Sequence, residues 1–241
     1  MTGHSTGDRE DSPVLSIELS QRLGGVAVVL GSGRIETVEV AGGRRETDDL
    51  APAIEAVLDR SGLEPASLGS IAVDVGPGGF TGLRISVAFA QMLAEVHRLP
   101  VYAASSALVA VTSTPGLDRT VGVVDVCVAA KRESAWRTRF VRSTVDEHWR
   151  AAADGEAIDE SGDLGQVDLL LADEHLGAGL RAAYEAADVD IAAPSFSPVA
   201  LGRLVIEEDS NLRRFEDAAQ LLPIYPRIPE AVRVWRNKTP R

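Results

Sequence analysis

The order of short apolar runs in the first hundred residues constrains the fold most. Three runs rich in Val and Ile, over 14–17, 26–30 and 35–40, are separated by glycine turns and predict an antiparallel meander of strands. Helix and strand patterns then alternate, with helices over 48–60, 83–97 and 106–111 and strands over 71–75 and 101–103. The resulting order is βββαβαβα.

This order matches one lobe of the ribonuclease-H-like fold that actin and the sugar kinases share. The second half predicts strands over 121–129, 135–141 and 167–171 and helices over 174–187 and 198–208. We therefore expect an α/β protein of the two-lobed, actin-like (ribonuclease-H-like, ASKHA) class, with mixed sheets flanked by helices. The predicted division is a disordered tail over 1–12, an N-terminal lobe over 13–112, a C-terminal lobe over 113–220 and an extended, Pro-rich and basic tail over 221–241.

Charge and composition exclude several classes of protein. The formal net charge of −12 disfavours RNA binding by the chain alone, unless its basic residues cluster. A single cysteine, Cys127, excludes an internal disulfide and a multi-cysteine metal site, and its apolar neighbours predict a buried residue. Residues 1–13 lack the apolar core of a secretory signal, and no run approaches the ~20 apolar residues of a membrane span. A cytoplasmic location without membrane contact is expected.

A glycine-rich segment, Gly76-Pro77-Gly78-Gly79-Phe80-Thr81-Gly82, joins a predicted strand to a predicted helix. Two interpretations stay open: a structural turn, which we favour because most glycine loops are turns, and an anion or partner contact. A phosphate-binding loop would end in Gly-Lys-Ser/Thr, whereas this one ends in Gly82-Leu83-Arg84. Pro77 also removes one amide donor. Arg84 is expected to clamp a carboxylate or to be solvated.

The helix predicted over 83–97 is apolar on two sides. One side carries bulky residues, namely Ile85, Phe89, Met92, Leu93 and Val96, and the other carries the smaller Leu83, Val87, Ala90 and Ala94. A helix on a sheet usually needs one apolar face, so a second partner is expected. We predict that the bulky side lies on the sheet. The small side would then meet the 48–60 helix or another protein, through an interface of Leu50, Ile54, Val57, Leu83, Val87, Ala90 and Ala94.

Catalytic residues are not evident in the sequence. Glu18, at the end of the first strand, is a lone carboxylate that is more simply a solvated strand end than a magnesium ligand. The four histidines, His4, His97, His148 and His175, form no metal-binding pair. Ser105 and Ser106 fit a helix cap better than a nucleophile, and Asp125 with Lys131 and Arg132 has no assignable role. No metal or cofactor is expected.

The run Gly76-Pro77-Gly78-Gly79-Phe80-Thr81-Gly82-Leu83-Arg84-Ile85 resembles the signature G-P-G-S-F-T-G-L-R-I of the TsaB (YeaZ) family. Only Gly79 departs from it, in place of serine. Residues 99–101 with 105–108 resemble the family's I-P-L…S-S-L-E-A-L, and 222–229 resemble its closing P-x-Y-L-R-x-P. Residues 18–20 depart from the usual D-T-S, and 129–136 depart from the D-A-R-R-x-E-V-Y pattern.

The resemblance implies a scaffold subunit without an active site of its own. Such proteins pair with the catalytic paralogue TsaD through a bundle formed by the two N-lobe helices, here 48–60 and 83–97, and the ATPase TsaE joins them. The complex transfers threonylcarbamoyl to the adenosine beside the anticodon of ANN-decoding tRNAs, so tRNA is met only through the complex. A homodimer through the same helices is also implied. The alternatives are an ATP-dependent kinase of the actin-like fold or a metallopeptidase-like relative.

Overall fold

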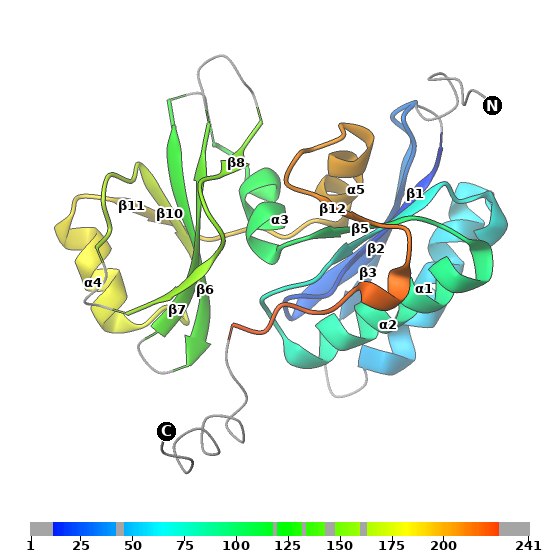
Figure 1. Ribbon diagram of the computed structural model, residues 1–241, viewed down its shortest axis with the longest axis horizontal. Helices are drawn as coiled ribbons and strands as arrows, with labels where there is room; N and C mark the ends of the chain where they lie inside the picture. The colour runs from blue at the N-terminus through cyan, green and yellow to red at the C-terminus, as the bar shows by residue number, and fades with distance from the viewer. Residues whose placement is uncertain are drawn as a thin grey trace, which may run out of the picture.

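The computed structural model describes residues 12–41, 46–117, 120–131, 134–142, 148–159 and 163–226. They form two lobes side by side, each built on one sheet, with α3 (Ser106–Ser113) and α5 (Pro198–Ile206) between them (Figure 1). The α/β class and the two-lobed architecture predicted from the sequence are confirmed. The predicted tail over 1–12 and most of the segment over 221–241 lie outside the described residues.

The first sheet has the strand order β12-β5-β4-β1-β2-β3. Its strands are β1 (Val14–Glu18), β2 (Leu23–Val29), β3 (Ile35–Ala41), β4 (Ser70–Asp74), β5 (Val101–Ala104) and β12 (Arg213–Phe215). The central β1 pairs with β2 in antiparallel and with β4 in parallel orientation, and all five of its residues are buried. A strand covered on both faces is mostly apolar, which explains the apolar residues at the centres of β1 and β4, although each strand ends in a buried carboxylate.

Helices cover both faces of this sheet. On one face, α1 (Glu46–Ser61) and α2 (Phe80–His97) pack on Leu15 and Ile17 of β1. On the other face, α5 lies against β1 and β2, where the Ser16 hydroxyl donates a 2.6 Å hydrogen bond to the Pro198 carbonyl. Because side chains alternate along a strand, the residues of β1 contribute to two separate cores, one on each face of the sheet.

The second sheet has the order β11-β10-β6-β7-β8, with β9 also paired to β7. Its strands are β6 (Val123–Lys131), β7 (Ser134–Val141), β8 (Arg150–Ala151), β9 (Glu156–Ile158), β10 (Leu169–Ala172) and β11 (Asp190–Ala192). Val124 and Phe140 face α3 and α5 and form a core shared by the two lobes. On the outer face, α4 (Ala178–Ala186) packs Leu180 and Tyr184 against the sheet.

The predicted order βββαβαβα is confirmed, but the chain returns to the first lobe after completing the second. The strand β12 extends the first sheet beside β5, and the short helix η3 (Ala218–Gln220) contacts α2. Residues 213–220, which lie within the range 113–220 predicted for the C-terminal lobe, thus contact the first lobe. The strands β8, β9, β11 and β12 were not predicted, because two or three residues are too few to show a period.

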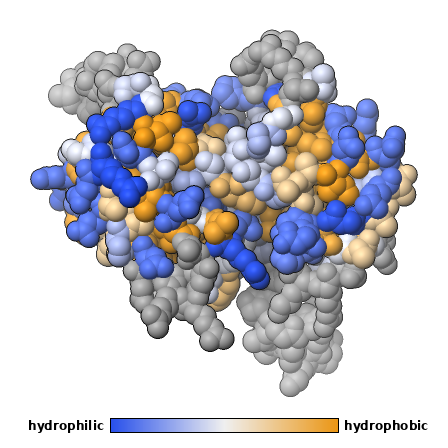
Figure 2. Space-filling view, turned by 180° about the vertical axis from the view of Figure 1, so that it is seen from behind, coloured by the Kyte–Doolittle hydropathy of each residue, from blue (hydrophilic) through white to orange (hydrophobic). Residues whose placement is uncertain are grey.

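The face seen from behind carries several separate groups of hydrophobic residues among hydrophilic ones, over both lobes (Figure 2). No helix among the described residues is both long and apolar enough to cross a bilayer.

Candidate functional site

The glycine-rich segment lies against the turn between β1 and β2. The Gly79 amide donates a 2.7 Å hydrogen bond to the Ser20 carbonyl oxygen. A Cβ atom on Gly78 would overlap that same oxygen, and one on Gly82 would overlap the carbonyl oxygen of Leu19. These two glycines are therefore required by the close approach of two backbone segments.

Two amides of this segment, those of Gly76 and Gly79, donate to the protein itself. The Gly76 amide donates a 2.7 Å hydrogen bond to Asp74 Oδ1, and Pro77, which is buried and follows a cis peptide bond, has no amide hydrogen. The Val75 carbonyl accepts a 2.6 Å hydrogen bond from the Ile224 amide. Because the donors point into the chain rather than into an open concave nest, the geometry favours the structural turn of the two interpretations left open.

Two buried carboxylates lie beneath this segment, at the carboxyl ends of the neighbouring parallel strands β1 and β4. Neither Glu18 nor Asp74 is exposed. Glu18 Oε1 accepts hydrogen bonds from the Ser20 amide (2.8 Å) and hydroxyl (2.5 Å). Asp74 Oδ1 accepts 2.7 Å hydrogen bonds from the Gly76 amide and the Ser106 hydroxyl. The second oxygens, Glu18 Oε2 and Asp74 Oδ2, receive no hydrogen bond from the described residues.

Burial, followed by the charge of Glu18, raises the pKa of Asp74 to about 8. Burial also raises the pKa of Glu18. Two ionised carboxylates offer only acceptors to one another, so a hydrogen bond between the two groups needs a proton on one of them. We infer that the pair holds at least one proton at neutral pH.

The prediction that Glu18 is a solvated strand end is wrong. Glu18 is a buried residue, and Asp74, which the sequence analysis did not single out, is its neighbour. The available signal was an acidic residue closing an apolar strand directly before the glycine-rich segment. Among the described residues, no cluster of three or more His, Cys, Asp or Glu side chains could hold a metal ion.

The orientation predicted for the second helix is also wrong. The small residues of α2 face the sheet: Leu83, Val87, Ala90 and Ala94 are at most 5 % exposed. Ala90 and Ala94 let the helix axis approach β4 closely, whereas bulkier residues there would hold the helix away from the sheet. The sequence could not show which of the two apolar sides is buried, because periodicity reports the polarity of residues and not the space between the helix and the sheet.

The remaining residues of the predicted partner interface, on α1, belong to the same core. Leu50 and Val57 are fully buried and Ile54 is 7 % exposed, packed with residues of β1 and β2. All seven residues predicted to meet a partner are thus covered by this chain itself.

The bulky side of α2 is the one that faces outward. Met92 is 51 % and Val96 68 % exposed, and at 100° per residue Ile85 and Phe89 fall on the same side. These two are partly buried, at the edge of the core. Apolar residues that a helix leaves in water form a stripe without a partner in this chain. The helix α2 therefore has a second apolar side, but the exposed side is the bulky one and the buried side is the small one.

The segment 218–226 crosses the outside of α2 as a strap (Figure 1). The Gln91 side-chain amide donates 3.1 Å hydrogen bonds to the carbonyl oxygens of Ala218 and Leu221. Leu221 is fully buried, and Ile224 packs on the core of the first lobe. The part of the predicted tail that the structure describes is therefore anchored to the first lobe.

Where the strap meets the beginning of α2, Phe80, Arg84 and Tyr225 form a cluster. The Arg84 guanidinium carbon lies 3.6 Å from the centroid of the Phe80 ring, and Arg84 Nε donates a 3.0 Å hydrogen bond to the Tyr225 hydroxyl. The two ring centroids are 5.5 Å apart. Arg84 thus clamps a tyrosine rather than the predicted carboxylate. Thr81, in the same helical turn, is exposed.

In the second lobe, the buried Asp125 has partners that the sequence did not indicate. Arg139 donates two hydrogen bonds to its carboxylate, of 2.7 and 2.8 Å, and the Tyr184 hydroxyl donates one of 2.7 Å. The same network raises the pKa of Arg139, chiefly through the hydrogen bond to Asp125. Donors from β7 and from α4 thus meet on one carboxylate of β6, so the network ties α4 to the sheet. The side chains of Lys131 and Arg132 lie outside the described residues.

The single cysteine lies beside this network, with its Sγ atom 4.0 Å from the Tyr184 hydroxyl oxygen. Cys127 is buried as predicted, and burial raises the pKa of its thiol to about 12. His97 ends α2, His148 precedes β8, and His175 precedes α4. His4 lies outside the described residues. Ser105 caps α3 as predicted, since its hydroxyl accepts a 3.2 Å hydrogen bond from the Leu108 amide.

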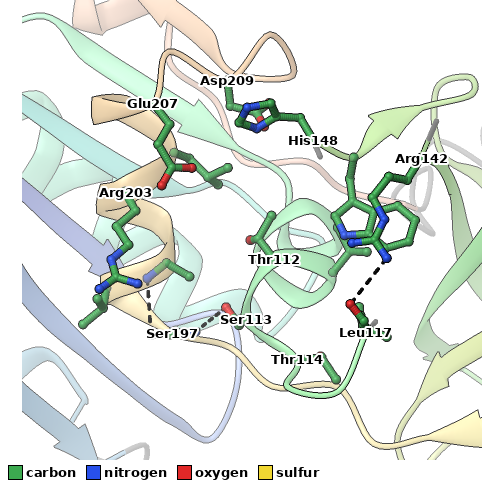
Figure 3. Close-up of a pocket in the computed structure, with 15 residues that line it drawn as sticks. Thr112, Ser113, Thr114, Leu117, Arg142, His148, Ser197, Arg203, Glu207 and Asp209 are labelled. Carbon is green, nitrogen blue, oxygen red and sulfur yellow. Dashed lines mark hydrogen bonds between the residues drawn. The ribbon is translucent and has the colours of Figure 1, made fainter. Parts of the chain in front are cut away.

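A pocket of about 450 Å³ lies between α3, α5 and the end of β7, at the opposite end of α3 from Asp74 (Figure 3). The Ser197 amide donates a 3.1 Å hydrogen bond to the Ser113 hydroxyl, and Arg142 donates to the Leu117 carbonyl at 3.4 Å. Arg142 also stacks on Trp149, with its guanidinium carbon 4.4 Å from the ring centroid. These contacts join the two lobes.

Comparisons with known proteins agree with this architecture. The model of the family "TsaD: tRNA N6-adenosine threonylcarbamoyltransferase" matches residues 39–160, about half of the chain. A search of curated protein sequences found no match. A Pseudomonas aeruginosa protein described as similar to the peptidase YeaZ is similar in structure, with a TM-score of 0.70 at 20% identity, over 90% of this chain and all of that one.

YeaZ from Pseudomonas aeruginosa is similar to the same degree, with a TM-score of 0.68 at 19% identity, over 89% of this chain and 99% of that one. The whole chain, rather than one lobe, therefore follows the YeaZ architecture. On the match to its family model, this chain belongs to the tRNA N6-adenosine threonylcarbamoyltransferase (TsaD) family, and it has the fold of the YeaZ (TsaB) proteins.

Proposed function

We propose that this chain is the non-catalytic scaffold subunit of a complex that transfers threonylcarbamoyl to the adenosine beside the anticodon of ANN-decoding tRNAs. Its partners would be a catalytic TsaD-type subunit, which it activates, and a TsaE-type ATPase. Family membership supports the tRNA-modification setting. The cytoplasm, where tRNA is modified, is the proposed location.

The observation that carries the scaffold role is the apolar stripe on the outer side of α2. Ile85, Phe89, Met92 and Val96 share one side of the helix, and two of them are more than half exposed. A patch of this kind on a soluble chain marks a site of association. The neighbouring α1 offers Ala51 and Pro52, both exposed, so a partner helix could lie beside the two helices at short range. The same stripe could support a homodimer.

The carboxylates at the strand ends support a non-catalytic role. In an active kinase of this fold, an acidic residue there must reach a magnesium ion in the cleft. Here Glu18 and Asp74 face one another beneath the backbone, away from solvent. Asp74 retains its proton up to about pH 8, and a protonated carboxyl is a poor magnesium ligand.

The proposal is tested by measuring association of the chain with the TsaD-type protein of the same cell by size-exclusion chromatography and calorimetry. Val96→Glu and Met92→Glu should each weaken binding by about 2 kcal/mol or more, roughly thirtyfold in Kd, because they place a charge at the centre of an apolar interface. Ala182→Glu, on the exposed side of α4, is the matched control and should bind normally. Normal assembly by both α2 variants would remove the basis of the proposal.

A further inference from the structure

The pocket at the junction of the two lobes has no part in the scaffold role. Its volume of about 450 Å³ lies in the range of sites that hold small molecules. One wall is the end of α3 with the residues that follow it, a second is α5, and a third comes from Arg142 and Trp149 of the second lobe (Figure 3). A molecule bound there would contact both lobes.

The wall from the second lobe is held in place by Arg142. Its guanidinium donates hydrogen bonds to the carbonyl oxygens of Leu117 (3.4 Å) and Val121 (3.2 Å), and it stacks on the Trp149 ring. Trp149 is buried, and so is Leu204, which lines the pocket from α5. Trp149 and Leu204 therefore give the pocket an apolar surface that exists before any ligand binds.

Charges of both signs lie along α5 where it borders the pocket. Arg203 and Glu207 are exposed and four positions apart, so they share one side of the helix, with Cβ atoms about 5–6 Å apart. In the part of the chain that the structure describes, neither side chain forms an ion pair. Figure 3 shows the Arg203 guanidinium toward the end of α5 that carries Ser197, whereas Glu207 lies at the other end.

The other carboxylate of the pocket is already used by the protein. Asp209 is 7 % exposed, and its Oδ1 atom accepts two hydrogen bonds of 2.8 Å, from the backbone and side-chain amides of Asn211. The Arg142 guanidinium is used in the same way, by its two carbonyl acceptors and the Trp149 ring. Arg203 and Glu207 are thus a cation and an anion that can pair with a ligand.

We propose that this pocket binds a small zwitterion of dipeptide size, with its ammonium group at Glu207 and its carboxylate at Arg203. Two extended residues span roughly 6–7 Å, which matches the spacing of two side chains four positions apart on a helix. A single α-amino acid carries both charges on one carbon atom and does not span this spacing. The apolar side chains of the peptide would lie on Trp149 and Leu204. The inference does not rest on the scaffold role.

Isothermal titration calorimetry of the full chain with the dipeptide alanyl-leucine tests the inference. The native chain should bind it with a Kd in the millimolar range or below. Arg203→Gln and Glu207→Gln should each weaken binding roughly tenfold, because each removes a charge-assisted hydrogen bond. Both residues are exposed, so the variants should fold normally. The matched controls are Arg213→Gln and Glu185→Gln, which remove exposed charges elsewhere and should bind as the native chain does.

Two modified peptides test which residue pairs with which group. N-acetyl-alanyl-leucine lacks the ammonium group, and alanyl-leucine amide lacks the carboxylate. The native chain should bind each roughly tenfold more weakly than the unmodified peptide. Glu207→Gln should bind the acetylated peptide as well as the native chain does, because the partner of Glu207 is already missing. Arg203→Gln should likewise bind the amide as well as the native chain does.

Four results would overturn the inference. They are no heat of binding at millimolar peptide, an equal loss of affinity in the controls, variants that respond in the same way to all three peptides, and binding of free leucine as tight as that of the dipeptide. Val96→Glu on α2 should leave peptide binding unchanged. Failure of pairing with the TsaD-type protein would therefore leave this inference standing, and failure of peptide binding would leave the scaffold role standing.

Discussion

Replacing Asp74 with asparagine should abolish a loss of stability that the native protein suffers as the pH rises. The pKa of Asp74 is raised from 3.8 to about 8 in the folded chain, first by burial and then by the charge of Glu18. Between these two values the folded state binds more protons than the unfolded state. The free energy of unfolding therefore falls as the pH increases, and the contribution of this carboxyl is fully present only below about pH 4.

The size of the effect follows from the shift. Each pH unit corresponds to about 1.4 kcal/mol per proton, so the shift of about four units corresponds to a total of about 6 kcal/mol. Between about pH 6 and about pH 8, the loss that this carboxyl contributes should be about 2 kcal/mol. That is a large part of the stability of a typical domain.

The Asp74→Asn variant keeps the acceptor oxygen that binds the Gly76 amide and the Ser106 hydroxyl. Its amide nitrogen would replace Oδ2 and offer a donor to the Glu18 carboxylate, whose Oε2 receives no hydrogen bond from the part of the chain that the structure describes. We expect the unfolding free energy of this variant to vary little between about pH 6 and about pH 8 and to exceed that of the native chain at the higher pH. Asp59→Asn, on the exposed side of α1, removes one carboxyl elsewhere and should leave the pH dependence unchanged.

Urea denaturation followed by tryptophan fluorescence and circular dichroism, at several pH values, measures these free energies. The explanation is refuted if the native chain and the Asp59 variant lose no stability between about pH 6 and about pH 8. It is equally refuted if Asp74→Asn shows the same pH dependence as the native chain, since another group would then be responsible.

Four further predictions concern the helices and the cysteine. Gly82→Ala should destabilise the fold by about 2 kcal/mol or more in urea denaturation, because its Cβ would overlap the Leu19 carbonyl oxygen; Gly79→Ser should instead stabilise it by a few tenths to 1 kcal/mol, because the site is open and the serine could cap α2. Ala90→Arg should lower the unfolding free energy by about 3 kcal/mol or more, because Ala90 is fully buried against the sheet; a fully stable variant would contradict the orientation found for α2. Cys127 should react with iodoacetamide no faster than the chain unfolds, because its thiol is buried and its pKa is about 12; rapid labelling of the native chain would exclude this.

Much of the fold could be predicted from local patterns in the sequence. The apolar runs of β1 and β4 and the helical periods of α1 and α2 are properties of contiguous residues, so their type and order were correct. The need for glycine at 78 and 82 was also visible as a turn between strand and helix. The resemblance of the segment over 76–85 to a family signature led to the same architecture.

The tertiary structure decided the features that depend on distant parts of the chain. Glu18 and Asp74 are 56 positions apart in the sequence and meet only because β1 and β4 are neighbouring parallel strands. Tyr225 reaches Arg84 only because the chain returns to the first lobe through β12 and the strap. The side of α2 that is buried was decided by the space above the sheet, where Ala90 and Ala94 fit and Met92 and Val96 do not. Periodicity records which residues avoid water, but the distance between two packed elements selects which of two apolar sides is covered.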